Sequence, residues 1–336
     1  TNGGLRPLTP AVVVRAYAFA PGMTSTNIDT VTYVFPARVL TQTRPAGFTN
    51  LEQFDVDQNV VNSPLYSGRF LSDLAALPTM SVVGNYTHVF GSSGLLRANN
   101  GTIEIPGSIE VMHPDGREDQ VDCGLTPHSW IQNKRSIRVY FRAAYGDDKW
   151  RHDLFRESTE GHGIGVKSFD GMVLRAGFND GLLYPEVARQ GRYSFSVDEL
   201  GRSSQIAMTG FGPRGLFVHL YVNGLYWGLY NPVERPESSF WSDNFGGSKD
   251  DYFARNHGGT VDGNPTFYNG LISGALSWTT VQARLDVPSF ADYILYWTYC
   301  GGGDWPSYNG SNNNWYAGNR VLATPGKVRF FVWDCE

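Results

Sequence analysis

The sequence is poor in cysteine, in charge and in long apolar runs. Its 336 residues include only Cys123, Cys300 and Cys335, so one thiol is left over in any pairing and no disulfide framework is predicted. Charged residues make up 18%, the net charge is −5, and no Lys/Arg run follows a phosphate backbone, which argues against nucleic acid as a partner. No apolar segment reaches the about 18 residues of a membrane-spanning helix, and no signal-peptide pattern begins the chain.

Glycine, proline and aromatic residues are what the sequence has in quantity. It contains 39 Gly and 18 Pro, and 14% of its residues are aromatic, which favours turns and strands over long helices. The length is sufficient for two domains, or for one large domain with an appendage, and for a sizeable core. We therefore expect a globular α+β protein that is rich in loops.

The first 35 residues have the pattern of a β-hairpin. Residues 12–19 and 31–35 are β-branched and aromatic runs, and Pro21-Gly22 marks a turn between them. This pattern resembles the last hairpin of a small β-sandwich, the C-terminal module found beside bacterial chitobiase-type enzymes. Residues 36–76 read as a connector in which only 71–77 indicates a helical turn.

From residue 77 onward the pattern predicts an antiparallel sheet. Asn223-Gly224 between two apolar runs is a strong hairpin signal. Lys134 begins a segment that alternates between a polar and an apolar face, and a basic residue on such a strand can bind phosphate if it faces a cleft. The alternative is that the polar face of this strand is exposed to solvent and binds no ligand. The predicted strands cover residues 79–83, 108–112, 136–141, 216–222 and 225–230.

Residues 286–300 give the clearest helical pattern, with Pro288 in the first turn. This helix leads to Asp304. Cys300 and Cys335 flank the segments around Asp304 and Asp334, and we expect free thiols, with a bridge in an oxidising compartment as the alternative. The residues predicted to pack on the inner face of the helix are Phe290, Tyr293, Ile294, Leu295 and Trp297.

The last 36 residues combine two acidic residues with a cluster of amides. Asp304 lies in a Gly-rich turn, Asn313 and Asn314 follow it, and Asp334 ends a short apolar segment that reads as a buried strand. Phosphoryl transfer needs one carboxylate to orient the attacking hydroxyl, and a second carboxylate with an amide oxygen to hold magnesium. Ordinary turn chemistry is the alternative for each residue taken alone.

Several motifs together resemble the spore coat protein H (CotH) kinase family, which has an atypical protein-kinase-like fold. The resemblance covers about residues 77–336. The residues that carry it are 77–81, 134–136, 222–235, Asp304-Trp305, Asn314-Trp315-Tyr316 and Trp333-Asp334.

The resemblance implies a role for each of five residues. Lys134 would contact nucleotide phosphate and Glu234 would lie near the nucleotide. Asp304 would be the catalytic acid, and Asn314 and Asp334 would hold Mg²⁺. The implied cofactors are ATP and Mg²⁺.

Two features depart from the general kinase pattern. In that pattern only about four residues separate the catalytic Asp from the metal-binding Asn, whereas Asn313 and Asn314 stand nine and ten residues after Asp304. An insertion therefore separates the acid from the amide. Residues 160–165, in which Gly alternates with other residues, do not have the spacing of a phosphate-binding loop and read as a turn.

These observations predict a division into 1–35 (part of the β-sandwich module), 36–76 (connector) and 77–336 (CotH kinase-like domain, truncated at its C-terminus). The expected function is transfer of the ATP γ-phosphoryl group to Ser or Thr of a protein. One alternative is a catalytically silent scaffold in a large modular protein outside the cell or at its surface, with a matrix protein as partner. Another is a carbohydrate-binding module, based on exposed aromatics such as Trp227, Trp241 and Trp278.

Overall fold

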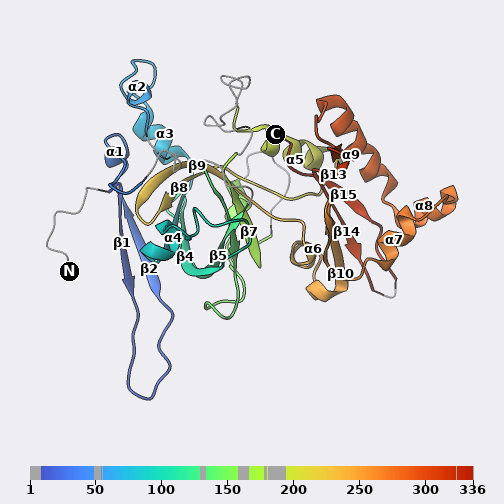
Figure 1. The fold of residues 1–336 in the computed structure, drawn as a ribbon, viewed down its shortest axis with the longest axis horizontal. Helices are drawn as coiled ribbons and strands as arrows, with labels where there is room; N and C mark the ends of the chain where they lie inside the picture. Colours follow the sequence, from blue (N-terminus) through green and yellow to red (C-terminus); the bar gives the residue numbers. More distant parts are fainter. Residues whose placement is uncertain are drawn as a thin grey trace. The chain divides into compact units, whose positions relative to one another are not determined.

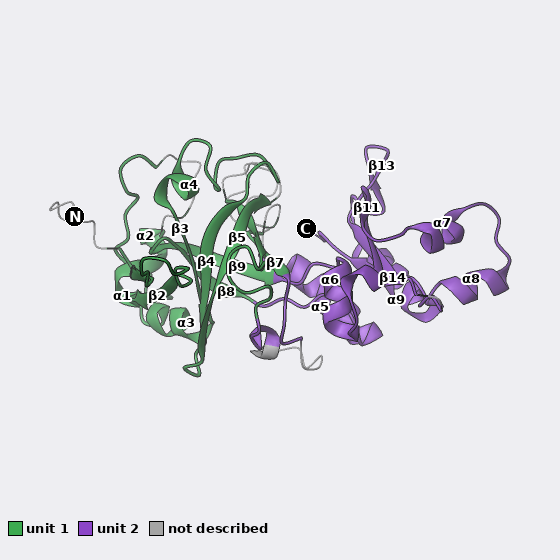
Figure 2. Ribbon diagram, turned by 90° about the horizontal axis from the view of Figure 1, so that it is seen from below, with its two compact units in different colours: residues 1–150, 171–191, 217–232 green, residues 151–170, 192–216, 233–336 purple. Residues whose placement is uncertain are grey.

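The computed structural model divides the chain into two compact units (Figure 2). It is an α+β structure with helices and several antiparallel sheets, as the sequence predicts. The division of the chain into domains after residues 35 and 76 remains a prediction. Unit 1 comprises residues 1–150, 171–191 and 217–232, and unit 2 comprises 151–170, 192–216 and 233–336. The structure describes residues 9–48, 54, 56–128, 134–157, 166–177, 180, 194–322 and 324–335.

Unit 1 contains a closed barrel of seven strands in the order β3-β4-β5-β6-β7-β9-β8. The β3–β8 pair is parallel, while β3–β4, β4–β5, β5–β6, β6–β7 and β8–β9 are antiparallel. Closure leaves these strands without a free edge. The strands are β3 (Thr79–Gly84), β4 (Ile105–Met112), β5 (Glu118–His128), β6 (Ser136–Tyr140), β7 (Gly171–Arg175), β8 (Val218–Val222) and β9 (Leu225–Val233).

The β8–β9 hairpin has the turn that its sequence predicts. Asn223 and Gly224 both have positive φ angles, 48° and 84°, which suits a two-residue turn between twisted strands. The Asn223 side chain also accepts a hydrogen bond of 2.8 Å from the backbone N–H of Gly84. The turn is thereby tied to the end of β3.

The predicted N-terminal hairpin is present as β1 (Ala11–Ala16) and β2 (Asp29–Val34) (Figure 1). Thr32 donates to Ser81 over 2.9 Å, and Ser108 donates to Thr30 over 2.9 Å. The hairpin thus packs on the barrel through a buried polar layer. The short helices of this unit are α1 (Pro36–Val39), α2 (Gln58–Val61), α3 (Phe70–Ala76) and α4 (Tyr86–Phe90).

Unit 2 is built on an antiparallel sheet of order β11-β10-β14-β15. Its strands are β10 (Tyr252–Asn256), β11 (Gly259–Asp262), β14 (Trp315–Arg320) and β15 (Arg329–Val332). The helical elements are η1 (Leu154–Glu157), α5 (Val197–Thr209), α6 (Ser238–Phe245), η3 (Lys249–Asp251), α7 (Thr266–Ile272), α8 (Trp278–Arg284) and α9 (Val287–Cys300).

Helix α9 confirms the predicted helix over residues 286–300. Asp286 is its N-cap and accepts a hydrogen bond of 3.3 Å from the Ser289 N–H. The expectation for Leu295 is wrong, because that side chain is 59% exposed. Leu295 lies about 200° around the helix from the buried Tyr293, and Tyr296 is buried instead.

Within the described residues, no helix has both the length and the apolar character needed to cross a membrane.

Candidate functional site

Asp304 lies in a loop that is anchored to α9 by aromatic side chains. The Trp305 ring stacks on Trp297, with ring centroids 5.3 Å apart and 4° between the ring planes. The Trp305 indole N–H also donates to the Tyr293 hydroxyl over 2.6 Å. Since Trp297 and Tyr293 belong to the core of unit 2, the residue next to Asp304 has a rigid support.

The insertion after Asp304 folds as a small hairpin of β12 (Ser307–Tyr308) and β13 (Ser311–Asn312). The backbone N–H of Asn313 donates to the Pro306 carbonyl over 2.9 Å, which closes the base of this hairpin. The Asn313 amide then donates to Asp304 Oδ2 over 3.4 Å. The hairpin therefore brings the amide back to the acid, despite the long separation of Asp304 and Asn313 in the sequence.

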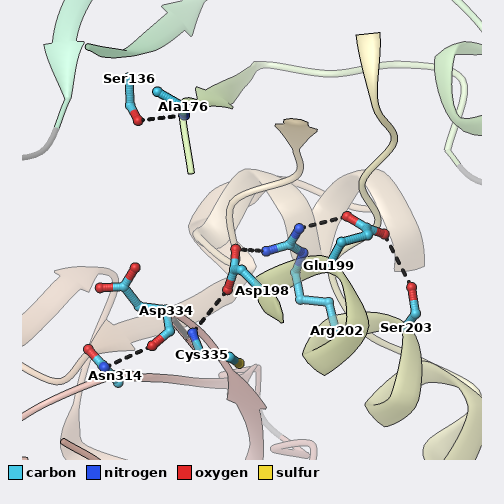
Figure 3. A network of polar contacts seen from close by, with 9 residues as sticks. All are labelled: Ser136, Ala176, Asp198, Glu199, Arg202, Ser203, Asn314, Asp334 and Cys335. Atoms are coloured by element: carbon cyan, nitrogen blue, oxygen red, sulfur yellow. Dashed lines mark hydrogen bonds and ion pairs between the residues drawn. The ribbon is translucent and has the colours of Figure 1, made fainter. Parts of the chain in front are cut away.

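The next residue, Asn314, holds Asp334 (Figure 3). Asn314 is 2% exposed, and its Nδ2 donates to the backbone carbonyl of Asp334 over 2.8 Å. Both residues have left-handed backbone, with φ angles of 60° and 59°, which Asn and Asp tolerate better than most residues. Because Trp315 pairs with Val332, this contact lies just beyond the paired ends of β14 and β15.

Helix α5 fixes β15 from its other edge. Gln205 Nε2 donates to the Phe330 carbonyl over 2.8 Å, and Gln205 Oε1 accepts from the Val332 N–H over 2.9 Å. The Gln205 side chain thus makes the hydrogen bonds to β15 that the backbone of a neighbouring strand would otherwise make. At the end of the segment, Asp198 Oδ1 accepts from the Cys335 N–H over 3.2 Å (Figure 3). The backbone is therefore held at Val332 and at Cys335.

The acid on α5 is itself paired. Asp198 forms an ion pair with the buried Arg202, and Arg202 Nη2 also donates to Glu199 Oε2 over 2.7 Å. In Figure 3 the Asp334 carboxylate points away from this pair. The α5 residues therefore position the backbone next to Asp334, and none of them was singled out from the sequence.

His257 is a second residue that the sequence did not indicate. It follows β10, and its backbone N–H donates to the Trp315 carbonyl over 3.0 Å. Burial lowers the pKa of His257, and the charge of Asp334 acts in the opposite direction. The imidazole therefore lies within the electrostatic reach of Asp334. A single His in a polar turn has no pattern that would have identified it.

Glu234 lies immediately after β9 and is 3% exposed. Its Oε2 accepts from the Arg214 N–H over 2.8 Å and lies 3.6 Å from Arg214 Nη1. Burial raises the pKa of Glu234 to about 7, although the Arg214 charge and its N–H both act to lower it. Glu234 is therefore a buried acid that titrates near neutral pH.

Lys134 belongs to unit 1. Its ammonium donates to the Leu229 carbonyl over 3.1 Å and lies 4.9 Å from the centroid of the Tyr230 ring. Burial lowers the pKa of Lys134 to about 7. Gly228 makes room for the ammonium, since a Cβ at that position would lie 2.7 Å from Lys134 Nζ.

The side chains of Asp304, Asn313, Asn314 and Asp334 have the type of oxygen atom that a hard cation binds. Across the described residues, no group of three or more His, Cys, Asp and Glu side chains is arranged to hold a metal ion. The four side chains comprise instead two carboxylates with two adjacent amides, and oxygen ligands of this kind are those that Mg²⁺ prefers. Each amide nitrogen is directed to an oxygen of Asp304 or Asp334, so Oδ1 is the atom of each amide that could bind a cation.

Adjacent residues thus connect the two acids, since Asn313 contacts Asp304 and Asn314 contacts Asp334. That their carboxylates share one pocket stays a prediction, as do the roles of Lys134 and Glu234. The glycines of 160–165 lie outside the described residues.

Two tryptophans considered for sugar binding are core residues. Trp227 and Trp241 are 2% and 4% exposed, so the expectation that they are exposed is wrong. Trp227 stacks on Phe54 and Trp241 packs near Phe331. Trp278 is 61% exposed.

Asn313 and Asn314 thus place the Asp304 carboxylate and the Asp334 backbone next to adjacent residues of the chain. Residues 193–271 match the family model described as CotH kinase protein. The matched segment includes Asp198, Glu234 and His257. No curated protein matches the chain.

Proposed function

We propose that the chain is an atypical protein-kinase-like domain that transfers the γ-phosphoryl group of ATP to a Ser or Thr hydroxyl of a protein. The observation that carries this proposal is the pair of side-chain contacts from Asn313 to Asp304 and from Asn314 to Asp334. The first contact reaches the Asp304 carboxylate, and the second reaches the backbone carbonyl of Asp334. The match of residues 193–271 to the CotH kinase protein model supports the proposal.

In this proposal Asp304 accepts the proton of the attacking hydroxyl, and its loop is kept in place by the stack of Trp305 on Trp297. Asp334 and Asn314 would hold Mg²⁺, which would supply charge neutralisation for the phosphates. The hydrogen bonds to Asp198 and Gln205 keep the strand end that carries Asp334 from moving. Such rigidity matters because a displacement of about 1 Å can cost about a hundredfold in rate.

Lys134 and Glu234 are assigned to the nucleotide in the same proposal. Lys134 would give a positive charge to phosphate, and binding of phosphate would favour the protonated ammonium, whose pKa is lowered to about 7 by burial. Glu234 would lie near the nucleotide, where its contact with Arg214 orients it.

The second candidate function is a catalytically silent scaffold within a large modular protein of the cell surface or matrix. It is supported by the separations of nine and ten residues between Asp304 and the amides Asn313 and Asn314, which depart from the spacing of the general kinase pattern. We place both candidates outside the cell or at its surface, in a bacterial protein with a preceding chitobiase C-terminal-like module, and give them a protein substrate or a neighbouring matrix protein as partner.

Thermal unfolding with nucleotide distinguishes the two candidates. A ligand that binds the folded state at 100 times its Kd stabilises it by about 2.7 kcal/mol. We expect ATP with Mg²⁺ to raise the unfolding temperature, and ATP with EDTA or Mg²⁺ alone to leave it unchanged. Phosphate on casein, detected by mass spectrometry, then tests transfer. No shift under any of these conditions would favour the scaffold.

A further inference from the structure

Arg255 is held between two aromatic rings of unit 2. It lies on β10, and its Cζ is 5.1 Å from the centroid of the Tyr268 ring on α7 and 5.4 Å from that of the Trp315 ring on β14. Both rings belong to the buried core of this unit. Contacts with ring faces fix the position of a guanidinium and use none of its five N–H donors.

The Arg255 guanidinium has no hydrogen bond and no ion pair within the part of the chain that the structure describes. Its Nε is buried, whereas the residue as a whole is half-buried, so its Nη atoms are the part that solvent can reach. Three other arginines of unit 2 differ, since Arg214, Arg235 and Arg329 lie 3.6, 3.2 and 2.8 Å from a carboxylate oxygen. Because a charge removed from water is costly unless it is paired, the unpaired Arg255 guanidinium is suited to an anion from outside the chain.

Trp315 connects Arg255 with the candidate site. It directly follows Asn314, whose amide donates to the Asp334 carbonyl over 2.8 Å, and it pairs with Val332 of β15. An anion bound to Arg255 would therefore lie beside the strand ends that carry these residues.

The loop that carries Asp304 is attached to the same core. Phe330 packs against Trp315, with ring centroids 5.6 Å apart, and against Tyr293, with ring centroids 5.7 Å apart. Tyr293 in turn accepts a hydrogen bond from the indole of Trp305, which directly follows Asp304. Both candidate acids and the unpaired guanidinium are thus attached to one aromatic core.

We propose that Arg255 binds the phosphate group of a phosphorylated Ser or Thr side chain of a protein. The Nη atoms of a guanidinium donate in a planar fork that matches two oxygens of a phosphate. A carboxylate matches the same fork, but a phosphate monoester carries about −1.5 to −2 charges and three acceptor oxygens, so an unpaired guanidinium binds it more strongly. The choice of phosphorylated Ser or Thr rests on the proposed function, in which such a group is the product. The binding step itself needs neither nucleotide nor metal.

The test uses the tripeptide Gly-phosphoserine-Gly, titrated into the full chain at constant ionic strength without nucleotide or divalent metal. In ¹H–¹⁵N spectra of the arginine Nε–H groups, the signal that disappears in Arg255→Lys is that of Arg255. We expect this signal to shift saturably with the phosphopeptide and to stay in place with Gly-Ser-Gly or acetate.

Calorimetry of the same titration measures the contribution of Arg255. Arg255→Gln should weaken binding about tenfold or more, because charge-assisted hydrogen bonds are lost. Arg255→Lys keeps the charge but not the planar fork, so its affinity should lie between those of the parent and Arg255→Gln. Arg38→Gln is the matched control and should bind as the parent does, because Arg38 also stacks on a ring, with its Cζ 4.7 Å from the Phe35 centroid, but belongs to unit 1.

An Arg255 Nε–H signal that the phosphopeptide leaves unchanged would overturn the proposal, whether or not the variants fold. So would binding of acetate with the Kd of the phosphopeptide, or binding of the phosphopeptide to a folded Arg255→Gln with the parent's Kd. ADP, titrated in the same way, separates the two sources of phosphate. If ADP shifts the Arg255 signal at a lower Kd than the phosphopeptide does, the site belongs to the nucleotide and the proposal is wrong. Failure of the proposed function differs from all of these results, because a chain without MgATP binding or phosphoryl transfer can still bind the phosphopeptide at Arg255.

Discussion

The side-chain amide of Asn314 donates a 2.8 Å hydrogen bond to the backbone carbonyl of Asp334, and both residues have left-handed backbone. The contact lies at the end of the β14–β15 pair, where the ladder of backbone hydrogen bonds stops. It therefore sets the direction in which the chain leaves β15. The same relationship determines where the Asp334 carboxylate can point.

Replacing Asn314 by Ala should destabilise unit 2 by about 1–3 kcal/mol, because a carbonyl loses its buried donor and Ala fits poorly at a positive φ. Urea unfolding measures the change. Asn312→Ala is the matched control, since Asn312 is exposed on β13 and should change stability by less than about 0.5 kcal/mol. Equal effects of the two variants would contradict the structural role of Asn314.

Gln205→Leu should cost about 2–4 kcal/mol in the free energy of unfolding. Gln205 is 1% exposed, and its loss leaves the Phe330 carbonyl and the Val332 N–H without this partner at a buried edge. Gln282→Leu, at an exposed position of α8, makes the same substitution without such contacts and should be nearly neutral. Hydrogen exchange at the Val332 amide should be faster in Gln205→Leu, and unchanged protection there would disprove the pairing.

The sequence predicts the parts of this fold that depend on local patterns. The β8–β9 hairpin follows from Asn223-Gly224, and α9 follows from the apolar periodicity after Asp286. Both patterns act over fewer than about 15 residues and need no distant partner.

The closed barrel could not be predicted in this way. It requires the parallel β3–β8 pair, whose strands lie far apart in the sequence, and no local signal specifies that pairing. Helix α5 was missed because four of its six buried residues are polar, namely Asp198, Arg202, Ser203 and Gln205. These side chains bind other side chains and the backbone. An apolar periodicity search does not find a helix of this kind.

The candidate site was predicted only in part, because some of its contacts also depend on tertiary structure. Asp304, Asn314 and Asp334 lie in motifs with unusual composition, whereas Asn313 contacts Asp304 only because the β12–β13 hairpin folds back. His257 approaches Asp334 through the pairing of β10 with β14. This pairing is a tertiary contact that the local sequence around His257 does not predict.

Glu234 should make stability depend on pH near neutrality. Its folded-state pKa of about 7 lies above the ordinary value of 4.5, so the folded protein binds this proton more tightly than the unfolded chain does. The stabilisation is therefore complete below about pH 4.5 and is lost as the pH rises through 7, up to about 3 kcal/mol in total. The unfolding free energy of the parent relative to Glu234→Gln should fall between pH 5 and pH 8.

The control for that titration is Glu118→Gln, which alters an exposed carboxylate at the start of β5. It should leave the pH dependence of the parent unchanged. A parent and Glu234→Gln that keep a constant difference from pH 5 to pH 8 would show that Glu234 does not titrate in this range.

Gly228→Ala should displace the Lys134 ammonium. The new Cβ would lie 2.7 Å from Lys134 Nζ, in a backbone with a φ angle of 98° that Ala rarely adopts. Gly116→Ala separates the effect of the positive φ angle from the effect of the clash, because Gly116 has a φ angle of 86° and open space around its Cβ position. We expect Gly228→Ala to cost about 1–2 kcal/mol more than the control in urea unfolding.

A double-mutant cycle completes the test. In a Lys134→Ala background the new Cβ has no ammonium to clash with. Gly228→Ala should then lower the free energy of unfolding by no more than Gly116→Ala does. An unchanged extra cost in that background would show that the Lys134 ammonium is not what Gly228 accommodates.

Asp334→Asn tests the metal-ligand assignment directly. Asn accepts left-handed backbone, and the contact from Asn314 reaches the backbone carbonyl rather than the carboxylate, so the substitution should leave the fold intact. It removes the charge that a divalent cation requires, and we expect Mg²⁺-dependent ATP binding to weaken by about tenfold or more in calorimetric titration. Asp250→Asn, at an exposed position of η3, should bind as the parent does. If Asp334→Asn is folded and binds MgATP with the parent's Kd, Asp334 is a strand-end turn residue, because Asn serves that purpose equally well.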